Sequence, residues 1–441
     1  MRLLPAFILC AAALSAAELV PDGGARLARI ADDGFAGSSV NVLANSQHTL
    51  ITHGDTQYAA FYAADSTVVL AKRAAGAVRW TTHRTALKGR TADAHNTLAL
   101  GVDGDGYLHL SWDHHADPLN YVRSTAPGSL EFGPREPMTG QREKSVTYPA
   151  FLNLPGGDLL FFYRDGSSGR GNLVLNRYDV RAKRWTPVHA NLIDGEGARS
   201  AYPAYTMDTQ GGLHLAWVWR ASPDVATNQD IAYARSADGG VTWTAIDGRP
   251  LTVPFTAANA DYALRAGPNR SLMNPPSLAA DAAGRPVIAN YWKPEGSDIP
   301  QFHVLHHDGK RWHTTQVTQR TTPFTLAGAA TRRPPISRAV LGVRATKDSG
   351  REVVLIYRDD ERDSRIIAAA CANLKSAPWR FATLTTDSVG SWEPSFDPVP
   401  WARAGEIHLL VQSVTQRDGN DREPVAAAPT PVSTLIWKPA P

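Results

Sequence analysis

The 441-residue chain has little cysteine and little net charge, and each scarcity excludes a class of protein. Two cysteines cannot build a disulfide-stapled scaffold or a cysteine-rich zinc module. The 45 Lys and Arg residues nearly balance 42 Asp and Glu, so the formal charge of +3 lacks the strongly basic character of nucleic-acid-binding domains. With 43% apolar and 20% charged residues, the composition indicates a large soluble globular protein rather than a disordered or fibrous one.

Long apolar runs are also missing, except for a short one at the beginning. Arg2 supplies a positive n-region, Leu3 to Leu14 form an apolar core, and Ser15 to Ala17 have the small side chains of a cleavage site. This run is shorter than the roughly 20 residues that span a bilayer. We therefore expect a signal peptide at residues 1–17, one domain at residues 18–441, and a secreted or periplasmic protein without membrane insertion.

Turn-forming and aromatic residues are plentiful, with 35 Gly, 31 Pro, 12 Trp, 13 Tyr and 12 Phe. A turn glycine followed by a strand-like apolar run occurs seven times, at Gly54, Gly106, Gly157, Gly212, Gly284, Gly350 and Gly405. Repeats of this size are typical of four-stranded propeller blades. One Asp-box, Ser236 to Trp243, is a turn motif of sialidase-like blades. The sequence predicts an all-β fold, a seven-bladed β-propeller that the strand Ser433 to Trp437 closes; a large sandwich or barrel is the alternative.

The repeat also predicts where a ligand binds. Within a hairpin, the residue that begins the first strand and the residue that ends the second return to one edge of the sheet. In a propeller these edges surround a central depression, which is the default ligand site. The residues expected at this edge are His48, His95, Asn96, His114, His115, Tyr148, Arg164, Tyr202, Arg220, Asn274, Lys293, Arg338 and Arg358, with Glu393 as the carboxylate among them.

Cationic and aromatic side chains dominate that set. A depression lined by one sign of charge attracts the opposite sign, and arginine suits carboxylates and sulfates. Aromatic rings suit the faces of sugars. The expected partner is therefore an anionic polysaccharide, although each of these residues taken alone also fits a structural role.

Three motifs carry a resemblance to a known family. They are the string AHNTLALGVDGDGYLHLSWDHH from Ala94 to His115, TYPAF from Thr147, and FYRDGSSGRG from Phe162. Together they resemble the BNR-repeat polysaccharide lyases, especially the ulvan lyases. The resemblance implies a seven-bladed propeller whose central cleft degrades uronate-containing polysaccharides by β-elimination.

The same resemblance implies the catalytic residues. The family's two active-site histidines correspond to His95 and His115, its catalytic tyrosine to Tyr148, and its carboxylate-neutralising arginine to Arg164. His114 adjoins the matched histidine, and a slip of one residue would exchange them.

Elimination chemistry agrees with these residue types. Removing the proton beside a uronate carboxylate builds negative charge that a cation must neutralise, while a base takes the proton and an acid protonates the leaving oxygen. Arg164 can neutralise, and Tyr148 can act as base if nearby cations favour its phenolate. His95 and His115 can polarise or share proton transfer. We expect a monomer that requires no cofactor, with a structural metal ion still compatible with the sequence.

Other functions remain open at this stage. A glycosidase would need a carboxyl pair, for which the sequence offers only Glu393 and Asp113. A lyase or hydrolase acting on rhamnose-glucuronate linkages, or a non-catalytic carbohydrate-binding propeller, also fits. The histidine cluster around Asp308, formed by His303, His306, His307 and His313, is interpreted as surface histidines on a hairpin rather than a metal site.

Overall fold

The computed structural model describes residues 20–21, 24–43, 48–329, 333–348, 350–418 and 425–439. Strands dominate these residues, and their only α-helix is α1 (Pro398–Ala404). No helix in the described ranges is long and apolar enough to cross a membrane. The signal peptide expected at residues 1–17 lies outside the described residues.

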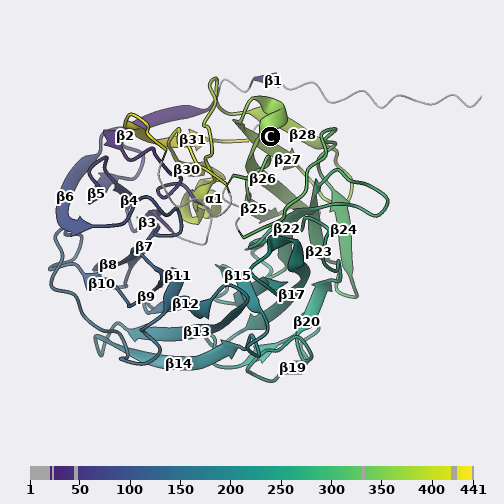
Figure 1. The fold of residues 1–441 in the computed structure, drawn as a ribbon, viewed down its shortest axis with the longest axis horizontal. Helices are drawn as coiled ribbons and strands as arrows, with labels where there is room; N and C mark the ends of the chain where they lie inside the picture. Colours follow the sequence, from purple (N-terminus) through teal and green to yellow (C-terminus); the bar gives the residue numbers. More distant parts are fainter. Residues whose placement is uncertain are drawn as a thin grey trace, which may run out of the picture.

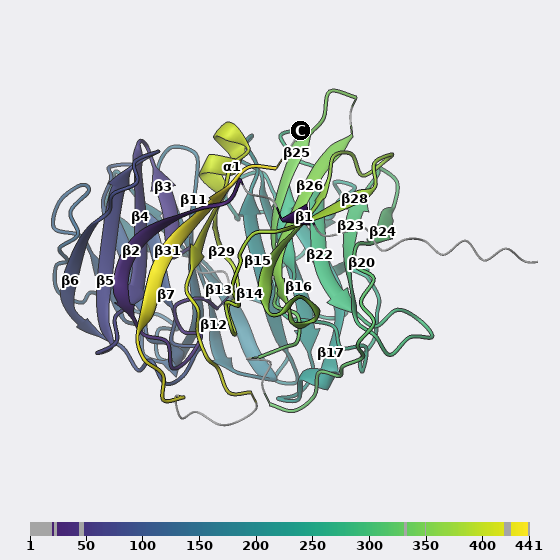
Figure 2. The same ribbon diagram turned by 90° about the horizontal axis from the view of Figure 1, so that it is seen from above.

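The sheets stand side by side around a central axis, in a propeller-like arrangement (Figures 1 and 2). The overall prediction of an all-β propeller-like fold is therefore confirmed. The first two sheets contain β3 (Leu50–His53), β4 (Thr56–Tyr62), β5 (Thr67–Ala74) and β6 (Thr81–Lys88), then β7 (Leu98–Val102), β8 (Leu108–Trp112) and β10 (Tyr121–Arg123).

The next sheet has 11 strands because two blade-like groups join through a parallel contact between Gly171 and Ser200. The first group is β9 (His115–Asp117), β11 (Val146–Asn153), β12 (Leu159–Ser167), β13 (Arg170–Asp179) and β14 (Arg184–Ile193). The second is β15 (Ser200–Met207), β16 (Leu213–Arg220), β17 (Asn228–Ser236), β18 (Trp243–Thr244), β19 (Pro250–Leu251) and β20 (Asp261–Leu264), with the 3₁₀ turn η1 (Val225–Thr227). The predicted Asp-box forms the turn between β17 and β18, where the Ser236 hydroxyl contacts the Asp238 carboxylate at 2.8 Å.

Three further sheets complete the arrangement. The first contains β21 (Ser277–Ala280), β22 (Pro286–Trp292), β23 (Gln301–His307) and β24 (Trp312–Gln316). The second contains β1 (Val20–Pro21), β25 (Val340–Ala345), β26 (Arg351–Asp359), β27 (Arg365–Cys371) and β28 (Trp379–Thr383), with the turn η2 (Asp360–Arg362). The third contains β2 (Arg26–Gly34), β29 (Ser395–Asp397), β30 (Ile407–Val411) and β31 (Thr430–Trp437). In the last sheet β31 pairs with both β30 and β2, so strands from the two ends of the chain are hydrogen-bonded. This pairing confirms the prediction that a strand around Ser433 to Trp437 joins the ends of the fold.

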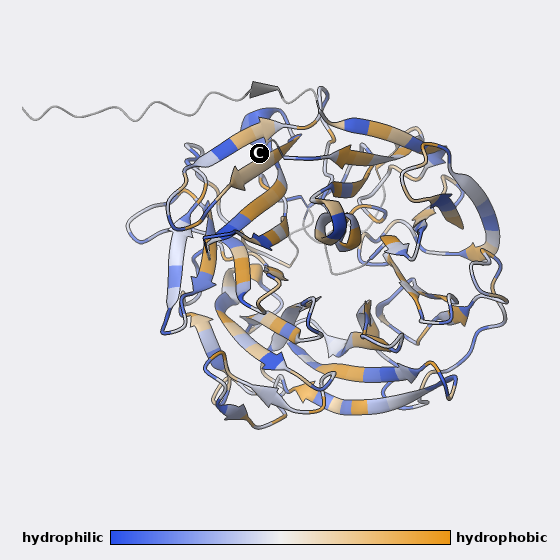
Figure 3. Cartoon of the chain, turned by 180° about the vertical axis from the view of Figure 1, so that it is seen from behind, coloured by the Kyte–Doolittle hydropathy of each residue, from blue (hydrophilic) through white to orange (hydrophobic). Residues whose placement is uncertain are grey.

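Burial explains the apolar runs of the sequence. Every residue of β8, β16, β22 and β30 is buried, because each of these strands is covered on both faces by neighbouring sheets. The outer strand β6 instead alternates between exposed and partly buried residues. Figure 3 shows hydrophobic residues frequent along the inner strands. Between two sheets, Phe302 packs against Tyr291 and Tyr357, and burying each such ring stabilises the fold by roughly 1.5–3 kcal/mol.

The turn glycines belong to a repeated polar device. The Asp103 carboxylate accepts the backbone N–H groups of Asp105 and Tyr107 and contacts His109 Nε2 at 3.1 Å. Asp208 is arranged in the same way with His214, at 3.0 Å. Each carboxylate thus tightens the turn between the first two strands of its group and satisfies a buried imidazole.

The inner strands surround an axial cavity of about 720 Å³. Helix α1 lines it at the end where the turn glycines lie, with Trp401 donating to the Val343 carbonyl at 3.1 Å. The residues expected at the ligand site lie at the opposite ends of these strands. The fold therefore has a turn face, which carries the turn glycines and α1, and a site face.

Candidate active site

Two histidines form the centre of the site face. His95 lies in the loop that precedes β7, and His115 begins β9 after the chain returns along β8. The register of β7 and β8, which pairs Leu98 with Trp112, brings the two positions opposite each other. Their imidazole rings stack with centroids 4.2 Å apart and planes inclined by 28°.

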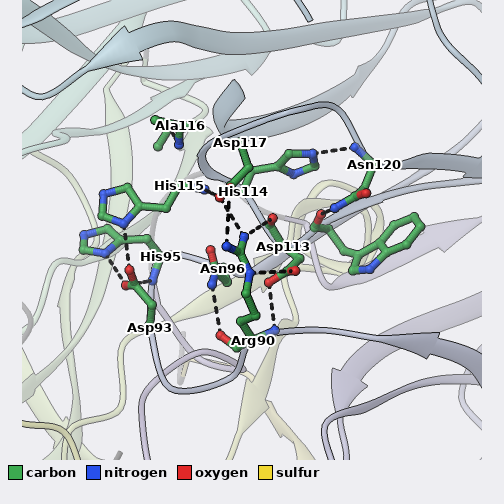
Figure 4. A network of polar contacts seen from close by, with 12 residues as sticks. Arg90, Asp93, His95, Asn96, Asp113, His114, His115, Ala116, Asp117 and Asn120 are labelled. Atoms are coloured by element: carbon green, nitrogen blue, oxygen red, sulfur yellow. Dashed lines mark hydrogen bonds and ion pairs between the residues drawn. The ribbon is translucent and has the colours of Figure 1, made fainter. Parts of the chain in front are cut away.

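A single carboxylate, Asp93, holds both rings (Figure 4). One oxygen of Asp93 accepts from His95 Nδ1 and the other from His115 Nδ1, each at 2.7 Å. Burial raises the pKa of Asp93, but the hydrogen bonds and charges of the two histidines outweigh burial and hold the pKa well below its ordinary value. Because both Nδ1 atoms face the Asp93 carboxylate, the second nitrogen of each ring, Nε2, lies on the side away from it.

The loop that carries His115 is clamped by Arg90. Its guanidinium contacts Asp113 at 3.1 Å and Asp117 at 2.6 Å, and Asp117 in turn accepts the His115 backbone N–H at 3.0 Å. Asp113 and Ala116 have φ values of 67° and 64°, in the left-handed region that non-glycine residues rarely adopt. Strained backbone held by an ion-pair network is common where side chains must be aimed.

His114 is excluded from this pair. It is buried, and its Nε2 accepts the Asn120 backbone N–H at 2.8 Å (Figure 4). Burial lowers the pKa of His114 to about 3, so the ring is neutral near pH 7. Of the two adjacent histidines, the structure therefore selects His115 to accompany His95.

Tyr148 lies beside the histidine pair on a β-bulge. The pairing of β11 with β12 shifts between Thr147 and Ala150, and Tyr148 has a φ of 53°. Its ring centroid is 5.9 Å from that of His95, and the Arg164 guanidinium carbon lies 4.9 Å from the same ring. The Tyr148 hydroxyl makes no hydrogen bond to any residue of the described ranges. Tyr148 as a residue is partly exposed, so a ligand can reach its side chain.

Tyr202 contrasts with Tyr148 although their ring centroids are only 6.0 Å apart. The Tyr202 hydroxyl accepts from Arg220 Nη1 at 2.9 Å and Arg164 Nη1 at 3.3 Å, and contacts Ser168 at 3.0 Å. Burial opposes ionisation, but Arg220 and Arg164 outweigh it and lower the pKa of Tyr202 to about 8. Burial raises the pKa of Tyr148, and the nearby Tyr202 raises it further. The neighbouring arginines act in the opposite direction but do not outweigh these two effects. The cations therefore favour a phenolate at Tyr202, not at the tyrosine that the sequence singles out.

Arg338 is held by an ion pair. Its Nη1 contacts both oxygens of the fully buried Glu393 at 2.9 and 2.8 Å, and its Nε donates to the Asn274 carbonyl at 2.6 Å. Glu393 is thus committed to Arg338. Asp113 is likewise committed to Arg90, so the two carboxylates that a glycosidase would require are both bound to arginines.

Arg358 is buried and does not face a ligand. Although the register of β25 and β26 places it opposite Arg338, its guanidinium donates to the carbonyls of Pro334, Pro335 and Trp392, and 1% of the residue is exposed. The sequence pattern placed its backbone correctly but could not show that local carbonyls and the Asp360 carboxylate capture its donors.

The remaining expected binding residues have structural contacts. The Asn96 side-chain amide donates to the Arg90 backbone carbonyl at 3.0 Å. The side-chain oxygen of Asn274 accepts from the side-chain amide of Asn228 at 2.8 Å. Lys293 Nζ donates to Thr325 at 2.9 Å. His48 lines the axial cavity rather than the histidine pair.

Asp93, Arg90 and Ser168 were missed in the sequence. Asp93 stands two residues before His95, a spacing at which an Asp side chain often bonds to nearby groups, and this was the available signal. Arg90 and Ser168 gave none, because their partners are remote in the sequence or in another strand.

One group among the described residues could hold a metal ion. It consists of Asp93, His95 and His115, whose ligand atoms lie within 4.8 Å of one another. The histidines around Asp308 do not form such a group among the described residues: His303 stacks on Trp292 at 4.0 Å, and His313 contacts the Asp308 carboxylate.

Comparisons with known proteins show which proteins this chain is similar to. An ulvan lyase, short isoform, from Alteromonas sp. (strain LOR) is 24% identical over 40% of this chain, and the chain spans 45% of that relative's length. The crystal structure of the polysaccharide lyase Uly1 matches with a TM-score of 0.67 and 16% identity, covering 94% of this chain and 99% of that one. A structure of a PL25 ulvan lyase matches with a TM-score of 0.64 and 14% identity, covering 88% and 97%. These likenesses show the fold, and a family model matches residues 56–320. The chain belongs to the BNR repeat-containing family.

Proposed function

We propose that the protein is a secreted polysaccharide lyase that cleaves a uronate-containing polysaccharide by β-elimination. The observation that carries this proposal is the Tyr148 hydroxyl, which has no partner in the described part of the chain and lies between a carboxylate-bound histidine pair and an arginine cluster. The similarity to ulvan lyases, one of them solved with -[GlcA(1-4)Rha3S]- bound, supports the substrate class.

In the proposed reaction the uronate carboxylate lies beside Tyr148, in the field of Arg164, Arg220 and Arg338. These cations stabilise the negative charge that develops as the C5–H bond breaks. The electron pair of that bond forms the C4–C5 double bond while the C4–O4 bond breaks. A proton then goes to the departing O4, so the products are an unsaturated uronate and a free hydroxyl.

Tyr148 is the proposed base, and it can also return the proton to O4. Since burial and Tyr202 raise the pKa of Tyr148, the phenol needs an acceptor for its own proton. The histidine pair His95 and His115 is the proposed acceptor, and Asp93 stabilises the imidazolium that forms. General acid and base groups in such positions each contribute about 10²–10⁴-fold to the rate.

We further propose seven blades. Six blades would be the strand groups β3–β6, β7 with β8 and β10, β11–β14, β15–β18, β21–β24 and β25–β28, and β29–β31 with β2 would be the seventh. The segment at residues 1–17 has the pattern that directs a protein out of the cytoplasm, and a secreted enzyme would meet its polymer there.

Digestion of a panel of uronate polymers tests the activity. Ulvan, rhamnose-capped arabinogalactan and other uronate polymers are incubated with the protein, and ultraviolet absorbance of the unsaturated uronate is followed. Absorbance should rise with at least one polymer. New reducing ends without absorbance would identify a hydrolase, and binding without either signal would identify a carbohydrate-binding propeller.

The variant Tyr148→Phe tests the assignment of the base. It should lose turnover by about 10²-fold or more and keep polymer binding, because only the hydroxyl is removed. Tyr107→Phe, on the turn face, is the matched control and should leave the rate unchanged. A near-normal rate in Tyr148→Phe would move the role of base to a histidine.

A further inference from the structure

A second cavity, of about 400 Å³, opens on the turn face. It lies where three turns meet the start of β26: the turn between β21 and β22, the turn between β23 and β24, and the turn after β27. Because Tyr148 and the histidine pair lie at the opposite strand ends, this turn-face pocket is separate from the candidate active site. Its volume falls within the roughly 300–1,000 Å³ of small-molecule sites.

Positive charge dominates the lining of the turn-face pocket. Four of its lining side chains are arginines or lysines, against one lining carboxylate, Asp308, and burial lowers the pKa of the lining His306 and His307, which disfavours their charged forms. The four are Arg235, Arg285, Arg351 and Lys375. In a chain with a formal charge of only +3, such a concentration is local, and it focuses the field on an anion.

Two of the arginines are fixed in place, Arg351 by backbone carbonyls and Arg285 by the Asp281 carboxylate and one backbone carbonyl. Arg351 donates to the carbonyls of Pro286 at 3.3 Å and His307 at 2.7 Å. Arg285 contacts the Asp281 carboxylate at 2.7 Å and donates to the Gly350 carbonyl at 3.1 Å. These contacts join two neighbouring sheets and preorganise the wall of the pocket, which reduces the entropy cost of binding.

Other groups of the pocket retain unused hydrogen-bonding capacity. The Arg235 and Lys375 side chains make no hydrogen bond or ion pair with the described residues. The His306 Nδ1 atom is buried without a hydrogen-bond partner there, although its ring stacks on His313 at 5.4 Å. Buried polar atoms are usually satisfied, so an unsatisfied one that borders a cationic pocket points to a ligand.

We propose that the turn-face pocket is a second binding site for an oxyanion, the sulfate or carboxylate group of an anionic polysaccharide. Arg235 and Lys375 bind the anion directly, and His306 adds a donor when its Nδ1 is protonated. A polymer held here stays close to the protein while another part of it enters the active site. The choice of a polysaccharide as the source of the anion rests on the proposed function.

The test is affinity electrophoresis of the full-length protein in native gels that contain ulvan. The double variant Arg235→Ala/Lys375→Ala should be retained at least about 10-fold less than the wild type. Its rate on a short uronate oligosaccharide should be unchanged, since neither residue lies near Tyr148. Lys310→Ala/Arg311→Ala is the matched control, because it removes the same charge from exposed positions of the turn between β23 and β24 that do not line the pocket.

The outcomes separate this inference from the proposed function. Equal retention of the double variant and the wild type would overturn the inference, as would an equal loss in the control variant. Calorimetry with inorganic sulfate distinguishes the sources of the anion. If the double variant loses sulfate binding but is retained by ulvan as strongly as the wild type, the pocket binds a free anion, and the proposal that it binds a polysaccharide is wrong. Reduced retention supports the site even if no polymer yields an unsaturated uronate.

Discussion

His95 and His115 are stacked at 4.2 Å because both donate from Nδ1 to opposite oxygens of one carboxylate. This relationship fixes the tautomer of two rings at once and aims both Nε2 atoms away from Asp93. It also makes Asp93 a positioning residue, since it acts on the proposed proton transfer only through the two histidines.

Asp93→Asn should therefore reduce turnover by about 100-fold or more while leaving substrate binding almost unchanged. An amide has one acceptor oxygen, and its NH₂ group would face the Nδ1–H of one ring, so at least one histidine must change tautomer or rotate. Steady-state kinetics by ultraviolet absorbance measure the split between kcat and KM. Asp105→Asn, in an exposed turn, is the control. A loss confined to KM would show that Asp93 serves binding instead.

Tyr202→Phe should shift the pH dependence of kcat/KM toward lower pH. The pKa of Tyr202 is about 8, so above that pH it carries a negative charge that raises the pKa of Tyr148. Without this hydroxyl, Arg164 and Arg220 act on Tyr148 alone, and its phenolate forms at lower pH. A profile displaced by one pH unit would correspond to roughly 1.4 kcal/mol of interaction with the phenolate.

The comparison variant for that profile is Tyr205→Phe, which removes the hydroxyl of a partly buried tyrosine that stacks on Phe162 rather than on the arginines. It should leave the profile in place. If Tyr202→Phe instead moved the profile toward higher pH, Tyr148 would not be the group whose ionisation limits the rate.

The sequence predicted the fold and the backbone positions better than the side-chain contacts. The repeated turn glycines mark the hairpins, and symmetry about each turn correctly placed His95 opposite His115 and Arg338 opposite Arg358. Register does not say where a long side chain ends. Arg358 turns to backbone carbonyls of its own neighbourhood, and Arg338 to Glu393 from another sheet, because these partners are set by packing between sheets.

Glu393→Gln should lower the free energy of unfolding by roughly 3–5 kcal/mol, because it leaves the Arg338 guanidinium buried without its counter-charge. Chemical denaturation measures the change. Asp32→Asn removes one partner of the exposed pair with Arg29 and should change the free energy by less than about 1 kcal/mol. Equal effects of the two substitutions would mean that the buried pair is not maintained in solution.

His114 should make the protein sensitive to acid. Its pKa is about 3 in the folded protein against an ordinary 6.5, so the unfolded chain binds a proton first. The stability is fully present above pH 6.5 and is lost as the pH falls toward 3, at about 1.4 kcal/mol per pH unit. In His114→Gln the free energy of unfolding should depend less steeply on pH over this range. His83→Gln, on the outer strand β6, controls for the loss of a histidine, and an equal slope in wild type and His114→Gln would contradict the assignment.

Removal of metal ions should leave activity intact, and added Zn²⁺ should inhibit. Asp93, His95 and His115 are close enough to bind an ion, but their ligand atoms are already occupied by the two protons shared with the carboxylate. Zn²⁺ would have to displace those protons, which would remove the histidines from the proton transfer proposed for Tyr148. Dialysis against a chelator should preserve the rate, and a chelator should reverse the inhibition by Zn²⁺. A rate that falls on chelation and returns with a divalent cation would show that the ion, and not the shared protons, orders this pair of histidines.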